Sequence, residues 1–402
     1  MSTMADLTGQ DFFRDPAGEI KRLRQLGPLV KARFPIIGPV WLTTTQDMTG
    51  RILKDSANFS LRKEGRVAGA PWWLPGVMLT LANNMLTFDE PDHTRLRSIV
   101  DEAFRRRAIL EMEPRVAEIA LELADELFTQ GSPADLVARY ARKLPLAVIC
   151  ELLGLPLTDR ERFITWADRA TNITNVLGFI RMIPGVNSIK RYLEQQIDAV
   201  RTHGGAGLIA ELVRAEREGA KISREEMVAM VFLLLFAGTE TTTHLISGSA
   251  LELLKNPGLR HWLQQDPRRY DLAVEEFLRF VSPVQFSKPR HVRRDITLDG
   301  ISLKKGDKVM AMIAAANMDP AANECPEKLD LQRKPNRHIA FGTGIHFCLG
   351  HQLARIEGKE ALRALFDRWP DLALAVDPSE IRWRKRPGLR ALVALPVTPG
   401  GD

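Results

Sequence analysis

One stretch of this chain predicts an element that sets the dimensions of the fold around it. Ser223 and Glu226 form the S-x-x-E pattern of a capping box, which marks a helix start. An apolar run follows directly, and Asn256-Pro257 ends the element. A helix of this length would be roughly 48 Å long, enough to cross a whole domain. Because its middle is apolar on every side, we expect it to be buried in a mostly helical core.

The centre of this helix carries residues that disfavour a buried helix. Gly238 is followed by Thr239, Glu240 and three more threonines. Glycine costs about 1 kcal/mol in a helix interior, threonine hydroxyls compete for carbonyls one turn back, and a buried carboxylate is expensive. Penalties this close together indicate a distortion with a functional purpose. On this segment alone, a helix that merely surfaces here, with Glu240 in water, remains an alternative.

The rest of the chain is dominated by long amphipathic stretches with short Gly/Pro punctuation. Helical spacing of apolar residues predicts further helices at 109–130, 139–153, 208–218 and 348–369. Strand-like patches are short and lie near the ends, at 40–43, 296–303, 308–314 and 389–397. The strand–helix alternation that builds a parallel sheet is missing from the sequence. We therefore predict a mainly α fold, a single large helical domain over residues 1–402 with small peripheral antiparallel β-sheets.

Charge and cysteine content narrow the functional classes. The net charge is +6, from 56 basic and 50 acidic residues, and the densest basic cluster, at 105–107, lacks the interleaved aromatics of a nucleic-acid site. Three cysteines, Cys150, Cys325 and Cys348, are too few for a disulfide framework and fit a reducing compartment. The first residues do not resemble a secretory signal, and the longest apolar run is far short of a membrane span. We expect a soluble, cytoplasmic protein that binds neither nucleic acid nor membrane.

One cysteine lies in a glycine-rich loop. Residues 341–350 read FGTGIHFCLG, with two glycines before Cys348 and one after it. We expect a helix to begin at about Cys348, where backbone N–H groups and the helix dipole would stabilise a thiolate. Zinc would need four ligands, whereas His346 and Cys348 supply two. A cysteine nucleophile with His346 as its base and a buried structural cysteine also remain open for the loop alone.

This loop, F-G-x-G-x-H-x-C-x-G, resembles the haem-binding loop of the cytochrome P450 family. Three further motifs occur in the family's order. Residues 237–242, AGTETT, resemble the oxygen-activation segment of its long central helix. Residues 276–279, EFLR, resemble its E-x-x-R pair, and residues 93–97, HTRLR, resemble its haem-contacting H-x-x-x-R. These motifs span almost the whole chain, so the resemblance implies the cytochrome P450 fold of a soluble bacterial-type member.

The resemblance also implies roles for individual residues. Haem b would be the cofactor, with Cys348 as the thiolate ligand of its iron. A break at Gly238 would open a groove for dioxygen, where Glu240 relays protons from solvent and Thr241 acts beside the oxygen. Glu276, Arg279 and Arg333 would form a buried structural network. The residues implied to contact haem are His93, Arg97, Ala237, Arg290, His338, Phe341, Gly342, His346, Cys348 and Gly350.

The resemblance assigns an apolar set of residues to the substrate pocket: Trp72, Trp73, Leu233, Phe236, Phe286 and Leu389. We therefore expect hydroxylation of a hydrophobic small molecule with one atom of O2. Lys288 lies in the same region and is a candidate for contact with an acidic group. Atypical chemistry on the same fold (peroxygenation, desaturation or oxidative coupling) and a non-catalytic haem sensor are the alternatives. The Glu240–Thr241 pair favours the monooxygenase.

Electrons would come from a separate protein. The family's relatives use a small ferredoxin with its reductase, or a flavodoxin, and these partners are acidic. We expect basic residues near the thiolate to steer such a partner, namely Arg97, Arg105, Arg106, Arg107 and Arg355. The expected assembly state is a monomer.

Overall fold

The computed structural model describes residues 7–34, 37–63, 66–67, 76–102, 104–159, 162–166, 176–385 and 388–400. The chain divides into two compact units. The first unit comprises Met1–Gly69, Met112–Leu144 and Thr241–Asp402, and the second comprises Ala70–Glu111 and Pro145–Glu240. The single domain expected over 1–402 stays a prediction.

The first unit contains a five-stranded sheet in the order β1-β2-β10-β7-β3. Its strands are β1 (Leu29–Phe34), β2 (Gly38–Thr43), β3 (Phe59–Ser60), β7 (Arg290–Val292) and β10 (Lys308–Met310). β1 and β2 form an antiparallel hairpin in which Val30 faces Leu42. The sheets are antiparallel as predicted except at one pair, where β10 joins β2 in parallel with Val309 opposite Trp41. A parallel neighbour needs a long connection, and the chain between β2 and β10 supplies it.

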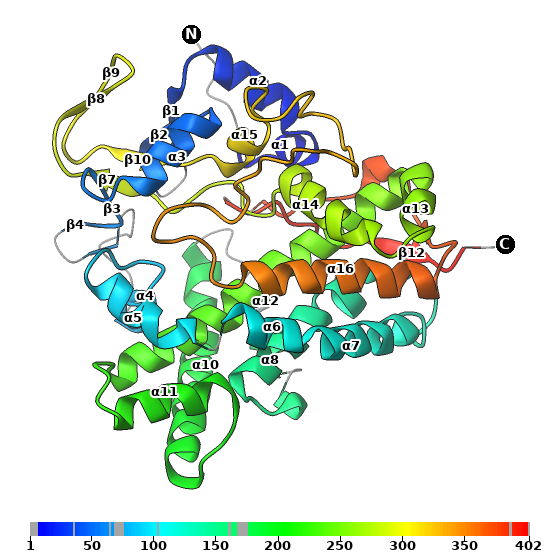
Figure 1. Cartoon of the computed structure of the whole chain (residues 1–402), viewed down its shortest axis with the longest axis horizontal. Helices are drawn as coiled ribbons and strands as arrows, with labels where there is room; N and C mark the ends of the chain where they lie inside the picture. The colour runs from blue at the N-terminus through cyan, green and yellow to red at the C-terminus, as the bar shows by residue number, and fades with distance from the viewer. Residues whose placement is uncertain are drawn as a thin grey trace. The chain divides into compact units, whose positions relative to one another are not determined.

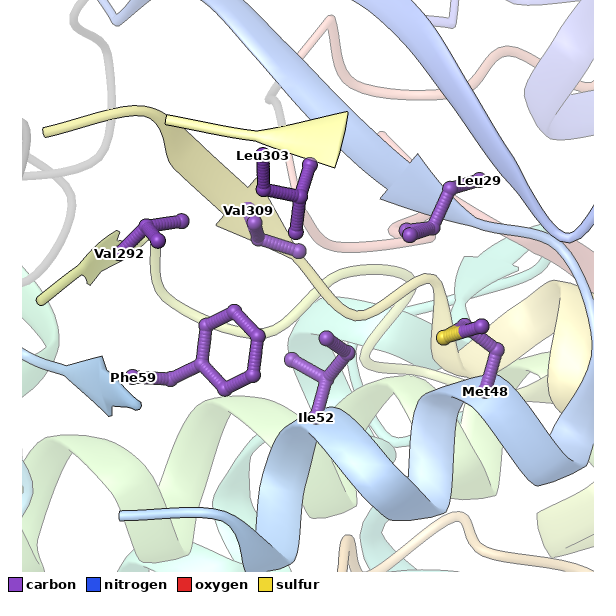
Figure 2. Close-up of a cluster of buried hydrophobic side chains, with 7 residues drawn as sticks. All are labelled: Leu29, Met48, Ile52, Phe59, Val292, Leu303 and Val309. Atoms are coloured by element: carbon purple, nitrogen blue, oxygen red, sulfur yellow. The ribbon is translucent and has the colours of Figure 1, made fainter. Parts of the chain in front are cut away.

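One face of this sheet is covered by α3 (Gln46–Lys54), and a hydrophobic core lies between them. Figure 2 shows Met48 and Ile52 of α3 opposite side chains of the strands and of the neighbouring hairpin. The members of this core are Leu29, Met48, Ile52, Phe59, Val292, Leu303 and Val309. Each is nearly or fully buried, so removal of their apolar surface from water holds α3 to the sheet.

The helices of the first unit include two long partners that lie side by side, α7 and α16 (Figure 1). Tyr140 donates a hydrogen bond of 2.6 Å from its hydroxyl to the carbonyl of Ala361 in α16, and Lys359 of α16 pairs with Glu113 of α7. The helices here are α1 (Gln10–Arg14), α2 (Ala17–Gln25), α7 (Glu113–Glu126), the π-helix η1 (Val137–Ala141), α13 (Pro257–Gln264), α14 (Arg269–Val281), α15 (Ile313–Asn317), α16 (His351–Arg368) and the 3-10 helix η3 (Pro378–Glu380).

The remaining strands of the first unit are short. β8 (Ile296–Leu298) and β9 (Ile301–Leu303) lie in the strand-like patch expected at 296–303, where they form a hairpin. β12 (Pro396–Thr398) pairs with β11 (Ala373–Leu374) and with β6 (Ala134–Asp135), while β4 (Arg62–Lys63) pairs with β5 (Arg66–Val67). The strand expected at 308–314 ends at Met310, because the chain turns into α15 at Ile313. In the strand expected at 389–397, only Leu389 and Leu392 form isolated bridges before β12 begins at Pro396.

The second unit is helical. Its elements are α4 (Gly76–Ala82), α5 (Asp92–Asp101), α6 (Arg106–Glu111), the 3-10 helix η2 (Leu157–Asp159), α10 (Val176–His203) and α11 (Gly207–Arg217), and α8 (Lys143–Leu153) enters it from the first unit. Ion pairs tie these helices together. Arg95 of α5 binds Glu226 at 2.6 Å, and Arg201 of α10 binds Glu216 of α11 at 2.7 Å.

The long helix predicted from the capping box is confirmed as α12 (Arg224–Lys255), 32 residues long. The Ser223 hydroxyl accepts a bond of 3.1 Å from the Glu226 amide, and the Glu226 carboxylate accepts one of 2.8 Å from the Ser223 amide. α12 is long and apolar enough to cross a membrane, but most of its apolar stretch is buried inside the protein, as in a core helix. It runs from the second unit into the first.

Candidate active site

Cys348 lies in the loop that leads into α16. The prediction that the helix begins at the cysteine was wrong by one turn, because α16 starts at His351 with Gly350 as its N-cap. The preceding backbone is held in turns instead: Cys348 donates its amide to the Phe341 carbonyl at 3.0 Å, and Phe347 donates to Gly344 at 3.0 Å. These bonds fix the cysteine just outside the amino end of α16.

The two glycines before the cysteine have different physical reasons to be glycine. Gly342 and Gly344 have φ angles of +69° and +77°, a region that other residues rarely adopt. Space around Gly342 is open, whereas a Cβ at Gly344 would lie 2.6 Å from the carbonyl oxygen of Leu53 at the end of α3. Gly344 therefore lets the loop approach α3 closely.

The loop around Cys348 keeps an accessible apolar surface despite its many hydrogen bonds. Every one of residues 338–352 retains exposed or half-exposed area, including Ile339, Phe341, Ile345 and Leu349. Folding normally buries apolar side chains. A hydrogen-bonded loop that leaves them accessible on both sides of a cysteine fits a large, flat, apolar ligand that brings a thiolate-binding metal to the sulfur. The haem group meets that description.

A carboxylate cross-links this loop to its neighbours. Glu275 of α14 accepts hydrogen bonds from His338 Nε2 at 2.9 Å and from Arg355 Nη2 at 3.0 Å. Burial opposes its charge, but the bonds from His338 and Arg355 prevail and lower the pKa of Glu275 to about 2. The Arg355 guanidinium also lies 4.7 Å from the ring centre of Phe341. α14, α16 and the two sides of the cysteine loop therefore form one connected network.

The sequence did not reveal Glu275 as part of the site, and the network bears on one predicted haem contact. Both ring nitrogens of His338 already have partners, Glu275 and the amide of Ala340. The assignment of His338 to haem stays a prediction, and its observed contacts are with the protein. The sequence signal for Glu275 is its position as a second glutamate directly before the E-x-x-R motif. What it binds is revealed only by tertiary contacts.

The middle of α12 has several accessible residues between two buried stretches, 227–231 and 242–253. Leu233, Phe236, Ala237, Glu240 and Thr241 are exposed or half-exposed, and they recur at i, i+3, i+4, i+7 and i+8. Residues at this spacing share one side of a helix. The predicted catalytic residues Glu240 and Thr241 therefore lie on one stripe of α12 with Leu233, Phe236 and Ala237, which were predicted to contact substrate or haem. Glu240 is half-buried, so it lies neither in bulk water nor fully desolvated.

The expected break of α12 at Gly238 was wrong, because the helix is uninterrupted from Arg224 to Lys255. The expected competition of a threonine hydroxyl for a helix carbonyl is observed: Thr239 Oγ1 donates to the Leu235 carbonyl, one turn back, at 2.6 Å. This back-bond is compatible with continued helical geometry. Gly238 also has a packing role, since a Cβ there would lie 3.3 Å from Ile149 Cδ1.

A buried acid beside this stripe was missed by sequence reasoning. Glu357 of α16 is 2% exposed and shares a hydrogen bond with Thr242, the neighbour of Thr241. Burial outweighs that bond and raises the pKa of Glu357 to about 8, so the side chain carries a proton at neutral pH. The signal in the sequence is an acidic residue within the apolar spacing of α16, which an amphipathic interpretation overlooks.

The E-x-x-R pair forms a buried ionic network. Glu276 and Arg279 are fully buried and lie 2.7 Å apart, and Arg333 joins Glu276 at 3.1 Å. Glu276 also accepts from the amide of Asp330 at 2.9 Å and from Asn336 at 3.0 Å. Arg279 donates to three backbone carbonyls besides. The structure thus brings together all three residues assigned to a structural role.

The basic residues assigned to haem lie in both units. Arg290 is 3% exposed at the start of β7, and His346 is half-buried in the cysteine loop. His93 and Arg97 lie on α5 in the second unit, where Arg97 binds Asp101 at 2.8 Å. Burial lowers the pKa of His93, which favours its neutral form.

The predicted substrate contacts of the first unit differ in accessibility. Leu389 is half-exposed and bridges to Val284. Phe286 is 4% exposed, with its ring 5.2 Å from Phe34 and 6.3 Å from Phe12 between ring centres, so it belongs to an aromatic core. Trp72 and Trp73 lie outside the described residues. Within the described part of the chain, no three His, Cys, Asp or Glu side chains gather closely enough to bind a metal among themselves.

Comparison with known proteins identifies relatives along the whole chain. A family model described as Cytochrome P450 matches residues 185–370. The polyketide biosynthesis cytochrome P450 PksS of Bacillus subtilis (strain 168) is 38% identical over 399 residues, 97% of each chain. Vitamin D(3) 25-hydroxylase of Pseudonocardia autotrophica is 38% identical over 401 residues, 98% of this chain and 96% of the relative.

A solved structure adds the three-dimensional match. The myxobacterial cytochrome P450 CYP267B1 in complex with myristic acid superposes with a TM-score of 0.92 at 37% identity, over 99% of both chains. This agreement confirms the predicted fold, a large helical structure with small sheets. The chain therefore belongs to the cytochrome P450 family, and it is an oxygen-incorporating oxidoreductase, a monooxygenase of a family whose cofactor is haem iron.

Proposed function

We propose that this monooxygenase binds haem b with Cys348 as the axial ligand and hydroxylates a hydrophobic small molecule. The observation that carries the proposal is the cysteine loop, which is rigidly bonded and yet apolar and accessible around the sulfur. When bound, haem b supplies a thiolate-ligated iron that activates O2. Phe341, Gly342 and Gly350 would contact the macrocycle on the cysteine side, and Ala237 would do so from α12.

The basic residues would hold the haem propionates. Arg290, His346, His93 and Arg97 are the side chains that the family resemblance suggests for this role. Buried carboxylates need such donors, and bonds between ionised groups are the strong ones. Neutral His93, favoured by the lowered pKa, would act as a hydrogen-bond donor.

Glu240 and Thr241 would move protons. Half-buried Glu240 can exchange protons with solvent while lying on the accessible stripe of α12. The Thr241 hydroxyl, next in the chain, can receive a proton and pass another on. Protonated Glu357, bonded to Thr242, supplies a second acid beside the same segment. The retained acid–threonine pair favours a monooxygenase over a peroxygenase.

The ligand assignment has a direct test. Cys348→Ala should abolish the Soret band that the reduced carbonyl complex shows at the position typical of thiolate ligation. Cys325→Ala is the matched control, because Cys325 is exposed and lies outside the loop. If the band of C348A keeps its position, Cys348 is not the ligand.

The proton-transfer role has a second test. Thr241→Ala should release more hydrogen peroxide per NAD(P)H consumed, at the expense of product. Thr241→Ser keeps the hydroxyl and should keep the coupling of the parent. Equal coupling in T241A and T241S would exclude the hydroxyl from the reaction.

We propose a substrate that is apolar over most of its surface. Leu233, Phe236 and Ala237 offer apolar area on the accessible face of α12, and Leu389 offers more in the first unit. The relatives' own names mention vitamin D(3), myristic acid and polyketide biosynthesis. A spectral-shift screen of steroids, fatty acids and polyketides against the haem-loaded protein would select the class, and the absence of any shift would count against an apolar pocket.

The electron donor would be a separate acidic ferredoxin or flavodoxin, and we propose a cytoplasmic monomer. The arginines nominated for steering carry local partners: Arg105 binds Glu102, Arg107 binds Glu111 and Arg355 binds Glu275. Such pairs cancel much of the field at a distance, so the steering should be modest. Electron-transfer rates measured at rising ionic strength should fall, and an insensitive rate would refute electrostatic docking.

A further inference from the structure

A buried arginine lies beside one of the proposed substrate contacts. Arg390 is 5% exposed, and the bonds of its side chain within the described part of the chain all go to backbone carbonyls. The guanidinium donates to Phe13 at 2.7 Å and to Arg14 at 3.2 Å. It also donates to Phe280 at 3.4 Å and to Val281 at 3.5 Å. Because burying a cation is costly, such an arrangement indicates that the placement of these partners matters.

The four carbonyls belong to the last turns of two helices. Phe13 and Arg14 end α1, and Phe280 and Val281 end α14. Carbonyls in the last turn of a helix lack partners within the helix, and the helix dipole makes this end negative. The guanidinium of Arg390 therefore satisfies two helix ends at once and joins them. A lysine ammonium, whose three donors radiate from one atom, could not reach four acceptors.

The backbone next to Arg390 carries Leu389, one of the proposed substrate contacts. The Arg390 amide donates to the Pro283 carbonyl at 2.9 Å, and Leu389 forms an antiparallel bridge with Val284. Successive side chains of such a paired, extended segment project to opposite sides. Arg390 points into the protein and holds its own backbone there. It therefore fixes the segment from which half-exposed Leu389 projects.

α1 also contacts the second proposed substrate contact of the first unit, Phe286. The ring of Phe12 stacks on that of Phe286, with 6.3 Å between ring centres. Trp383 donates its amide to Gln10 Oε1 of α1 at 2.8 Å, and the Arg390 guanidinium lies 4.8 Å from the centre of the Trp383 ring. α1 and both proposed contacts thus belong to one bonded assembly centred on Arg390.

We infer that Arg390 is a positioning residue for substrate selection, an inference that rests on the proposed function. It acts through Leu389, by holding the backbone of that residue to the ends of α1 and α14. α1, at the opposite end of the sequence, thereby takes part in selecting the substrate. A displaced Leu389 changes the fit of an apolar molecule, whereas the thiolate ligand Cys348 lies on a separate loop and stays in place.

The experiment compares haem-loaded parent protein with Arg390→Lys, Leu389→Ala and Arg24→Lys. Arg24 is the matched control, because this half-buried arginine also donates to backbone carbonyls, those of Thr44 at 3.1 Å and Ala315 at 2.8 Å. Each protein is titrated with imidazole and with 4-phenylimidazole, followed by the shift of the Soret band. The two probes share the nitrogen that binds haem iron and differ in an apolar ring. The ratio of their dissociation constants therefore reports the apolar fit.

L389A should lower the preference for 4-phenylimidazole over imidazole about tenfold, because apolar contact is lost. R390K should lower it about fivefold or more, since Leu389 is displaced. R24K should keep the ratio of the parent. In every variant, the reduced carbonyl complex should keep the Soret position of thiolate ligation.

A gentler variant covers the case in which R390K does not fold. Gln10→Ala removes the bond between α1 and Trp383 and leaves Arg390 in place. It should lower the preference in the same direction, by about twofold. An unchanged ratio in Q10A would then count against the inference.

An R390K protein that matches R24K, while L389A has lost the preference, overturns the inference about Arg390 and leaves the proposed function intact. If L389A keeps the ratio of the parent, the proposed substrate contact at Leu389 fails, and the inference fails with it. If R390K loses the thiolate Soret position, Arg390 supports the haem site as a whole, which overturns a role in selection.

Discussion

The burial of the Glu276–Arg279 pair makes a quantitative prediction, because the chain contains an exposed pair of the same geometry. Arg279 donates to Glu276 from Nε at 2.8 Å and from Nη2 at 2.7 Å, at i, i+3 spacing. Arg22 donates to Glu19 from Nε at 2.9 Å and from Nη2 at 2.6 Å, at the same spacing. The buried pair has no exposed side-chain surface, whereas the exposed pair keeps 42% and 26%. Glu276 therefore differs from Glu19 in its burial and in its additional contacts.

Glu276→Gln should lower the free energy of unfolding by about 3–5 kcal/mol, because two guanidiniums would remain in the interior without their counter-charge. The side-chain amide of the new glutamine also carries an NH₂ group, which cannot accept hydrogen bonds. It would replace one of the carboxylate oxygens that now accept from Asn336 and from the amide of Asp330. Glu19→Gln should cost less than about 1 kcal/mol, since solvent screens an exposed pair.

Urea unfolding of the haem-loaded variants, followed by far-UV circular dichroism, measures both losses against the parent. High salt should leave the loss in E276Q nearly unchanged and reduce the small loss in E19Q. Equal losses in the two variants would refute the argument that burial sets the strength of this pair.

Two further substitutions test the loop and the buried acid. Gly344→Ala should destabilise the protein and weaken haem retention more than Gly342→Ala does, because only at Gly344 would the added methyl group collide with the Leu53 carbonyl. Haem content and urea midpoints of the two variants measure the difference. Equal effects would contradict the close approach of the loop to α3. The pKa of Glu357, about 8 when folded, exceeds its ordinary value of 4.5, so the folded state holds the extra proton between these limits. The free energy of unfolding should therefore fall by about 1.4 kcal/mol per pH unit as pH rises through that window. Glu357→Gln should make this dependence on pH shallower. If the urea midpoints of parent and E357Q depend equally on pH between about 5 and 8, the raised pKa of Glu357 is refuted.

Features that depend on residues close together in the sequence could be predicted, whereas features that depend on tertiary contacts could not. The capping box at Ser223 and Glu226 is local, so the long helix was placed correctly from residue types alone. The start of α16 was displaced because a bond between Cys348 and Phe341 competes with helix initiation. The role of Glu357 depends on Thr242, more than a hundred positions away, and no short motif records such a pair.

α14 explains how the protein itself holds the cysteine loop in place. Its adjacent glutamates bind different parts of the segment around Cys348: Glu276 holds Arg333, upstream of the loop, while Glu275 holds His338 at its start and Arg355 in α16 beyond it. The loop is therefore clamped at both ends from one helix. A clamped loop loses little conformational freedom on binding, so more of the binding energy remains for the ligand. On this view the E-x-x-R motif and its preceding acid act as one positioning unit, which couples the fold of the first unit to the placement of the proposed iron ligand.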